Sequence, residues 1–233
     1  MTLHTKIKYR LANLWLSTVA SIWQLPNEIK NDVPYISQFA SPEYAEKILK
    51  DRIASDTDLR WQQTGAQSPD EYAKWVLTIC GMACTSMALL FFKHRNERIV
   101  SLAKDAFENS VYKPHGKELS NMHYAEYAPW IKKYGLKATI YTRMNIQGLQ
   151  YLLSKGKLVI ASVNPNIRGY ITADPKQKGG HLVLVTGYDK KANTITFHNP
   201  SGFVRLNTQQ NHTIPVPAFC QFFAGRGIAL TNI

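Results

Sequence analysis

Two apolar runs of strand length constrain the fold of this chain more than any other feature. Residues 158–163 are apolar or small and lie between Gly156 and Pro165, and residues 182–186 form a second run. A run of this length between turn-forming residues is typical of a strand that is buried on both faces. The sequence therefore predicts a sheet whose central strands are covered on each side.

Further patterns place helices ahead of this sheet. Residues 194–197 alternate between polar and apolar and predict a third strand, joined to the second through a hairpin-type turn at 189–193. Upstream, Ser41 and Ser68 are each followed by proline and an acid, as at helix starts. Longer helical spacing continues over 80–106, 118–134 and 146–155. Helices followed by antiparallel strands predict an α+β domain.

The composition fits one domain that carries a large positive charge. With 233 residues, of which 45% are hydrophobic, the chain can bury a sizeable core. No stretch reaches the roughly 18 apolar residues of a membrane-spanning helix, so no membrane span is expected. The 28 Lys and Arg outnumber the 16 Asp and Glu, which gives a net charge of +12. Because the basic residues are scattered and no zinc-finger spacing occurs, a nucleic-acid partner is not favoured.

The first 30 residues allow two interpretations. Basic residues at positions 6, 8 and 10 precede an apolar stretch, as in a signal peptide. Apolar residues that include Ile7, Leu11 and Ile22 also fall at helical spacing, which favours an amphipathic helix. We expect this element, residues 1–30, to precede a domain over 31–233. The odd number of cysteines, three, favours a reducing, cytoplasmic location, although the signal-like outline leaves export open.

Cys80 is the strongest candidate nucleophile. It lies where a loop passes into the long helical run, and a helix start favours the thiolate form of cysteine. Gly81 beside it lets a substrate carbonyl approach the backbone. The alternative is that Cys80 is a buried small apolar residue, as we expect for Cys84 and Cys220. No second Cys or His pair has metal-ligand spacing, so neither a metal nor another cofactor is expected.

His181 opens the second apolar run, where an imidazole needs a partner or a function. If the hairpin turns about Lys190, His181 lies nine residues before that centre and Asn199 nine residues after it, so the two face each other. An asparagine can then orient the imidazole toward a thiol. The alternative is that both residues cap strand ends, and a bulge would shift the count by one.

Four segments together resemble the bacteriocin-processing, C39-like cysteine peptidases of bacteria and their stand-alone relatives, which are papain-like. The segments are residues 33–38 (VPYISQ), 80–84 (CGMAC), 179–189 (GGHLVLVTGYD) and 198–202 (HNPSG). The resemblance implies a papain-like fold and a peptide or protein substrate. It also implies roles for four residues: Cys80 as nucleophile, His181 as general base and then acid, Asn199 as its orienting partner and Gln38 as oxyanion-hole donor.

Two departures from the family pattern concern the candidate site. The orienting position is usually aspartate in this family, whereas here it is Asn199. Gln38 precedes Cys80 by 80 − 38 = 42 positions, much farther than usual, which makes residues 41–75 an insertion. Gln62 or Gln63 is therefore an alternative oxyanion-hole donor. We expect the insertion to form a lid or a wall facing the substrate.

These observations favour a cysteine peptidase that hydrolyses peptide bonds through Cys80, His181 and Asn199. One alternative is an amidase of cell-envelope peptides, which uses the same residue types. The other is a non-catalytic peptide-binding module on the same fold, which the asparagine at 199 and the displaced glutamine would allow.

Overall fold

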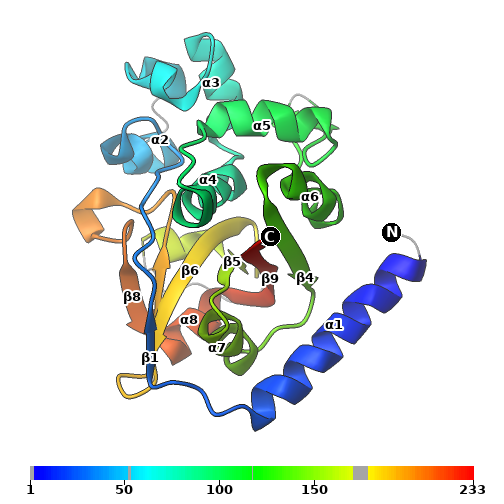
Figure 1. Cartoon of the computed structure of the whole chain (residues 1–233). Helices are drawn as coiled ribbons and strands as arrows, with labels where there is room; N and C mark the ends of the chain where they lie inside the picture. The colour runs from blue at the N-terminus through cyan, green and yellow to red at the C-terminus, as the bar shows by residue number, and fades with distance from the viewer. Residues whose placement is uncertain (1–2, 52–53, 117, 170–177) are drawn as a thin grey trace.

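The computed structural model describes residues 3–51, 54–116, 118–169 and 178–233, and its centre is an antiparallel sheet (Figure 1). Within these residues the sheet has seven strands in the order β4-β9-β5-β6-β7-β8, and β1 pairs with β6 outside this path. The strands are β1 (Glu28–Lys30), β4 (Leu136–Tyr141), β5 (Leu158–Val163), β6 (His181–Asp189), β7 (Thr194–His198), β8 (His212–Pro215) and β9 (Phe223–Asn232). A separate two-stranded antiparallel ribbon is formed by β2 (Pro114–His115) and β3 (Glu118–Leu119).

Helices cover both faces of the sheet, and each face has its own apolar core. One core contains side chains of α2 (Ala45–Lys50), α3 (Pro69–Val76), α4 (Cys80–Lys93), α5 (Ile99–Glu108) and α6 (Tyr124–Trp130). The other contains side chains of α1 (Leu3–Ile22), α7 (Ile146–Ser154) and α8 (Val216–Phe222). Short 3-10 turns complete the described elements: η1 (Pro42–Tyr44), η2 (Ser55–Thr57), η3 (Trp61–Thr64), η4 (Ile131–Tyr134), η5 (Pro165–Arg168) and η6 (Val204–Leu206).

The α+β prediction is confirmed, and so is the central place of the two apolar runs. Every residue of β5 is buried, and β5 lies between β9 and β6. Its neighbour β6 is buried from its first residue to its eighth. The predicted helix at 146–155 is α7, which ends before Gly156, a residue with the left-handed φ of +68° that helix ends favour.

Three local predictions were wrong. The helical run over 80–106 is two helices, because His94 adopts a left-handed φ of 54° and its backbone N–H caps α4 on the carbonyls of Leu89 and Leu90. The helix expected over 118–134 begins only at Tyr124, after the ribbon strand β3. Cys220, expected to be a buried apolar residue, is exposed on α8.

The hairpin register also differs from the simple count. Asp189 pairs with Thr194, so the turn is centred beyond Lys190, and the register shifts again at a bulge between Val185 and Gly187. On this register His181 is not directly opposite Asn199, since the last pair toward the strand end joins Leu184 to His198.

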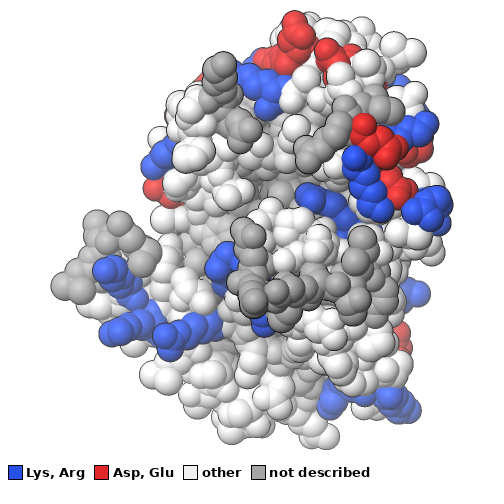
Figure 2. All heavy atoms as spheres, turned by 180° about the vertical axis from the view of Figure 1, so that it is seen from behind, with Lys and Arg blue, Asp and Glu red and all other residues white. Residues whose placement is uncertain are grey.

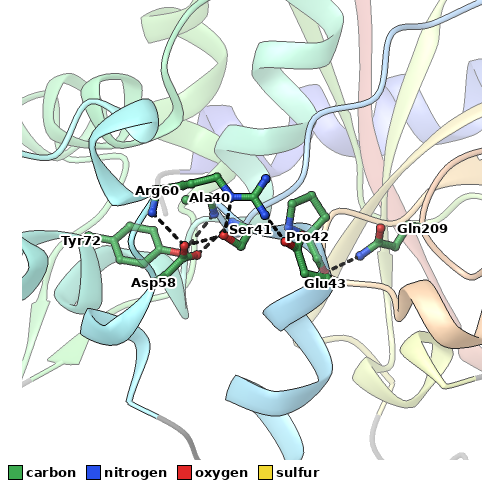
Figure 3. A network of polar contacts seen from close by, with 8 residues as sticks. All are labelled: Ala40, Ser41, Pro42, Glu43, Asp58, Arg60, Tyr72 and Gln209. Carbon is green, nitrogen blue, oxygen red and sulfur yellow. Dashed lines mark hydrogen bonds and ion pairs between the residues drawn. The ribbon is translucent and has the colours of Figure 1, made fainter.

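The 41–75 segment forms η1, α2, η2, η3 and α3, and a buried carboxylate ties its parts together (Figure 3). Asp58 accepts hydrogen bonds from the Ser41 backbone N–H (2.9 Å), the Ser41 hydroxyl (2.6 Å) and the Tyr72 hydroxyl (3.0 Å). Gln209, from the loop after β7, donates to the Pro42 carbonyl at 2.9 Å. The 41–75 segment, which begins shortly after Gln38, is thus anchored to the loop between β7 and β8.

No single helix among the described residues is long and apolar enough to cross a membrane. Only α3 and α4 taken together pass a test of length and composition, as a pair bent by 94°.

Candidate active site

Cys80 occupies the first turn of α4, where no side chain caps the helix. The backbone N–H groups of Cys80 and Gly81 therefore remain free to face the sulfur. Burial raises the pKa of the Cys80 thiol, while the Arg168 guanidinium and the N–H groups of Leu182, Gly81 and Cys80 act to lower it. Cys80 as a whole residue is half-buried.

Gly81 allows the close packing of α4 against its neighbours at this point. A Cβ on this residue would lie 2.7 Å from the Met122 sulfur and 3.1 Å from a Leu182 methyl group. A side chain at this position would require the Met122 and Leu182 side chains to shift. The glycine beside Cys80 lets the start of α4 pack against the start of β6, the strand that carries His181, without such a shift.

His181 is 1% exposed and makes its main contact with Asn199. Its Nε2 lies 2.8 Å from the Asn199 Oδ1, which also accepts the Ser201 backbone N–H at 3.3 Å. Because that oxygen can only accept, the Nε2 must carry the imidazole proton. The Nδ1 is then the nitrogen with a free lone pair, and it is the one that can take a proton from a thiol.

Arg168 contacts that nitrogen and was not predicted from the sequence. Its Nη2 lies 3.3 Å from the His181 Nδ1, and its Nε donates to the Ser201 hydroxyl at 2.7 Å. Burial lowers the pKa of Arg168, whereas the nearby Cys80 raises it. Burial and then Arg168 hold the pKa of His181 well below its usual range, against the Asn199 hydrogen bond, which raises it.

Cys80 and His181 line the same pocket, which has a volume of about 270 Å³. The other lining residues are Thr78, Asn121, Met122, Tyr124, Ser162, Gly180, Leu182 and Arg226. None of these described residues is acidic. Burial raises the pKa of Tyr124 to about 12, while a hydrogen bond with Ser162 and the charge of Arg226 act to lower it.

Gln38 lies near the site but outside this pocket's lining. It is fully buried, and its Nε2 donates to the Val76 carbonyl at 2.5 Å, four residues before Cys80. Its backbone N–H donates to the Pro200 carbonyl at 2.8 Å, directly after Asn199. The alternative donors Gln62 and Gln63 are exposed in η3 and do not line the pocket.

A comparison with models of known protein families identifies the family. A family profile described as the Peptidase_C39 like family matches residues 30–227. The chain belongs to this family. A search of curated proteins found no match.

A solved structure of a C39-like peptidase shares the fold, with a TM-score above 0.5. A Bacillus anthracis protein described as a C39-like peptidase aligns with a TM-score of 0.53 at 16% identity, covering 89% of this chain and 99% of that one. The peptidase domain of Streptococcus ComA, a bifunctional ABC transporter involved in quorum sensing, aligns with a TM-score of 0.41 at 15% identity, covering 67% of this chain and 93% of that one. The family profile confirms the resemblance to the C39-like peptidases.

The sequence motifs found three of the four residues that the fold gathers around the candidate C39-like site. Cys80 and His181 share a pocket, and Asn199 bonds to His181. Arg168 was missed because it follows the predicted strand at 158–163 in a polar turn, and nothing in its local pattern connects it to Cys80. The only available signal was its position just after the end of a buried strand, where site residues are common.

No metal centre accompanies these residues. In the part of the chain that the structure describes, no group of three or more His, Cys, Asp or Glu side chains is arranged to hold a metal ion.

Proposed function

We propose that this C39-like protein is a cysteine peptidase that uses Cys80, His181 and Asn199. One observation carries the proposal: the His181 imidazole is hydrogen-bonded to Asn199 through Nε2 and lines one pocket with the Cys80 thiol. Membership of a peptidase family supports a peptide or protein as the substrate.

In the proposed reaction, the His181 Nδ1 takes the thiol proton as the sulfur attacks the carbonyl carbon of the scissile peptide bond. The tetrahedral intermediate then expels the amine, which receives that proton from His181, and leaves a thioester on Cys80. Water, deprotonated by His181, attacks the thioester and releases the carboxylate product and the thiol. Asn199 holds the imidazole in the tautomer that this sequence requires.

The oxyanion of this intermediate needs donors. The Cys80 backbone N–H is one candidate, since it starts α4 and is not used within the helix. The Gln38 side-chain amide is the other candidate, because its Nε2 carries two N–H groups and donates only one of them, to the Val76 carbonyl. Each such donor contributes about 3 kcal/mol to transition-state stability in comparable enzymes.

Arg168 adds a feature to this mechanism. Its charge stabilises the Cys80 thiolate and offsets part of the burial that disfavours the charged sulfur. Its Nη2 also occupies the His181 Nδ1, so the guanidinium must release that nitrogen before His181 accepts a proton. We infer that substrate entry into the pocket displaces this contact.

The test is the pH dependence of iodoacetamide alkylation, measured by peptide mass spectrometry on the native protein and on His181→Ala. The exposed Cys220 serves as an internal reference in every sample. Although burial raises the pKa of Cys80, we expect it to react at a pH where an ordinary thiol, with a pKa of about 8.5, is protonated, because His181 takes the thiol proton during the attack. This reactivity should be lost in the variant. A peptide library then identifies cleaved bonds.

The Arg168 contact also favours a second candidate, a peptide-binding module without turnover. In the described conformation the His181 Nδ1 is already engaged, and Gln38 is bonded to Val76. If Cys80 alkylates like an ordinary thiol in both proteins, and library peptides bind without being cleaved, the binding module replaces the peptidase. No structural observation favours the envelope amidase, which stays an alternative for the library to address.

A further inference from the structure

The first helix, α1, presents an apolar face to solvent. Ile7, Leu11, Leu14, Trp15 and Ile22 are 49%, 62%, 65%, 49% and 79% exposed. At about 100° per residue these five positions fall within one sector of the helix. An apolar stripe of this kind on a protein surface indicates an interaction site.

The opposite face of α1 is fixed to the body of the protein. Leu16 and Ala20 are 1% and 4% exposed and belong to the core that α7 shares. The Asn13 side-chain amide is hydrogen-bonded to the loop after β4. Its oxygen accepts hydrogen bonds from the backbone N–H groups of Thr142 (3.0 Å) and Arg143 (3.2 Å), and its nitrogen donates to the Thr142 hydroxyl (2.7 Å). The rotation of the helix is therefore set, with the apolar stripe outward.

Basic side chains flank the stripe. Lys6, Lys8 and Arg10 are exposed, and α1 contains no acidic residue. Lys6 and Arg10 also line an open groove of about 990 Å³ between α1 and the loop that carries Arg143. No described residue lining this groove is acidic, and none of its three cations forms an ion pair with a described residue.

The wider surface has the same character. Figure 2 shows a group of Lys and Arg side chains with no adjoining Asp or Glu at its left edge, the side on which α1 lies. One acid comes near the helix, since Glu126 contributes to raising the pKa of Tyr9, after burial. Glu126 lies 3.7 Å from Lys113 and forms no ion pair with the three described cations of the groove.

We propose that α1 binds the surface of a lipid bilayer that contains anionic lipids. An apolar stripe with flanking Lys and Arg is the pattern of a helix that lies in the plane of the interface, with Leu and Ile among the acyl chains and cations on the headgroups. Trp15 suits the boundary between them, where one side of an indole is apolar and the other is wet. A second copy of the chain docked on the stripe would bring the same cations together, which opposes association.

Vesicle sedimentation tests the proposal with the full chain. We use vesicles of equal parts phosphatidylglycerol and phosphatidylcholine, and vesicles of phosphatidylcholine alone. A cation near an anionic surface contributes a factor of roughly five in binding, so we expect a large preference for the anionic vesicles that declines as salt is raised. Equal binding to both vesicles, or no binding to either, overturns the proposal.

Two variant pairs assign the binding to α1. The double change Leu11→Ser and Leu14→Ser removes the exposed stripe, whereas Leu59→Ser and Leu77→Ser changes leucines that are 86% and 54% exposed elsewhere. We expect only the first to lose at least tenfold in vesicle binding, since each exposed leucine contributes 1.5 kcal/mol or more when fully buried, about tenfold. Equal losses in both would contradict a role for α1.

The second pair of variants tests the charges. Lys6→Glu with Arg10→Glu removes two cations of α1, and Lys74→Glu with Lys132→Glu is the control, which changes the net charge by the same amount elsewhere. We expect at least about 25-fold weaker binding for the first, since each of the two lost cations contributes roughly fivefold and each added glutamate is repelled by the anionic surface, and a far smaller effect for the second. Sedimentation velocity without lipid completes the test. A dimer that the Leu11 and Leu14 changes dissociate, together with absent vesicle binding, would assign the stripe to a second copy and overturn the proposal.

Discussion

The Nδ1 of His181 lies 3.3 Å from the Nη2 of Arg168, so a guanidinium occupies the nitrogen that is needed to accept the thiol proton. The opposite nitrogen is committed to Asn199 at 2.8 Å. The imidazole is thus held between a cation and an amide oxygen, inside a buried site. This arrangement favours a neutral imidazole, while the charge of Arg168 offsets part of the burial that raises the pKa of Cys80.

Replacing Arg168 tests this electrostatic arrangement. In Arg168→Met the cation beside Cys80 is lost, which disfavours the thiolate, so we expect the Cys80 pKa to rise and alkylation at neutral pH to slow by roughly tenfold. Arg168→Lys should recover part of the rate. The control is Arg205→Met, an exposed arginine paired with Glu46. Unchanged alkylation in Arg168→Met would show that the guanidinium does not stabilise the thiolate.

The buried histidines predict a loss of stability in acid. Burial lowers the pKa values of His181 and His198 in the folded state, so the unfolded state binds more protons once the pH falls below about 6.5. The stabilisation is complete above that pH and is lost as the pH falls toward the folded values. We expect each histidine to cost about 1.4 kcal/mol per pH unit in this window.

Urea unfolding at pH 7, 6 and 5 measures this dependence. The free energy of unfolding should depend less steeply on pH in His181→Gln and in His198→Gln. Its pH dependence should be unchanged in a variant of the exposed His94. A free energy of unfolding that is flat between pH 7 and 5 would contradict the prediction.

The polar network of the 41–75 segment predicts a large effect at Asp58. The carboxylate is fully buried and accepts hydrogen bonds from Ser41, Tyr72 and the Arg60 backbone. Asp58→Asn turns one accepting oxygen into a donor and leaves hydroxyl or N–H groups without an acceptor. We expect about 2 to 4 kcal/mol of lost stability by urea unfolding, and less than about 0.5 kcal/mol for the exposed Asp56→Asn.

The sequence could predict the central strands because their apolar runs are local signals. It could not predict β9, whose place between β4 and β5 depends on pairing across distant segments. Its glycines hide it as a strand: Gly227 is needed because a Cβ there would lie 2.5 Å from the Ile160 carbonyl. Close approach of two backbones requires a glycine, but a glycine in the sequence does not indicate which strand lies next to it.

The candidate site follows the same division. The His181–Asn199 contact was predicted from a hairpin centred on Lys190, whereas Asp189 pairs with Thr194 and the turn is centred farther along the chain. The contact forms because Asn199 directly follows β7, where its side chain can reach back. Arg168 reaches the site from η5, beyond the end of β5. No count along the chain fixes that approach, since it depends on the path of a turn rather than on a ladder.

Asn199 gives the sharpest prediction for the proposed peptidase. Asn199→Ala removes the acceptor of the His181 Nε2–H, so the imidazole can turn and present the wrong tautomer. We expect Cys80 alkylation and any peptide cleavage to fall by tenfold or more, with Asn96→Ala, an exposed loop asparagine, as the control.

Asn199→Asp separates the role of the hydrogen bond from the role of the charge. It keeps an acceptor on Nε2 and adds a negative charge, which favours the imidazolium and so raises the His181 pKa. At low pH the alkylation rate of Cys80 is limited by the fraction of neutral His181. The rise of this rate with pH should therefore occur at higher pH in the variant, while the maximal rate stays the same. If the aspartate variant loses activity as completely as the alanine variant, the amide nitrogen of Asn199, which has no partner among the described residues, would be the group that matters.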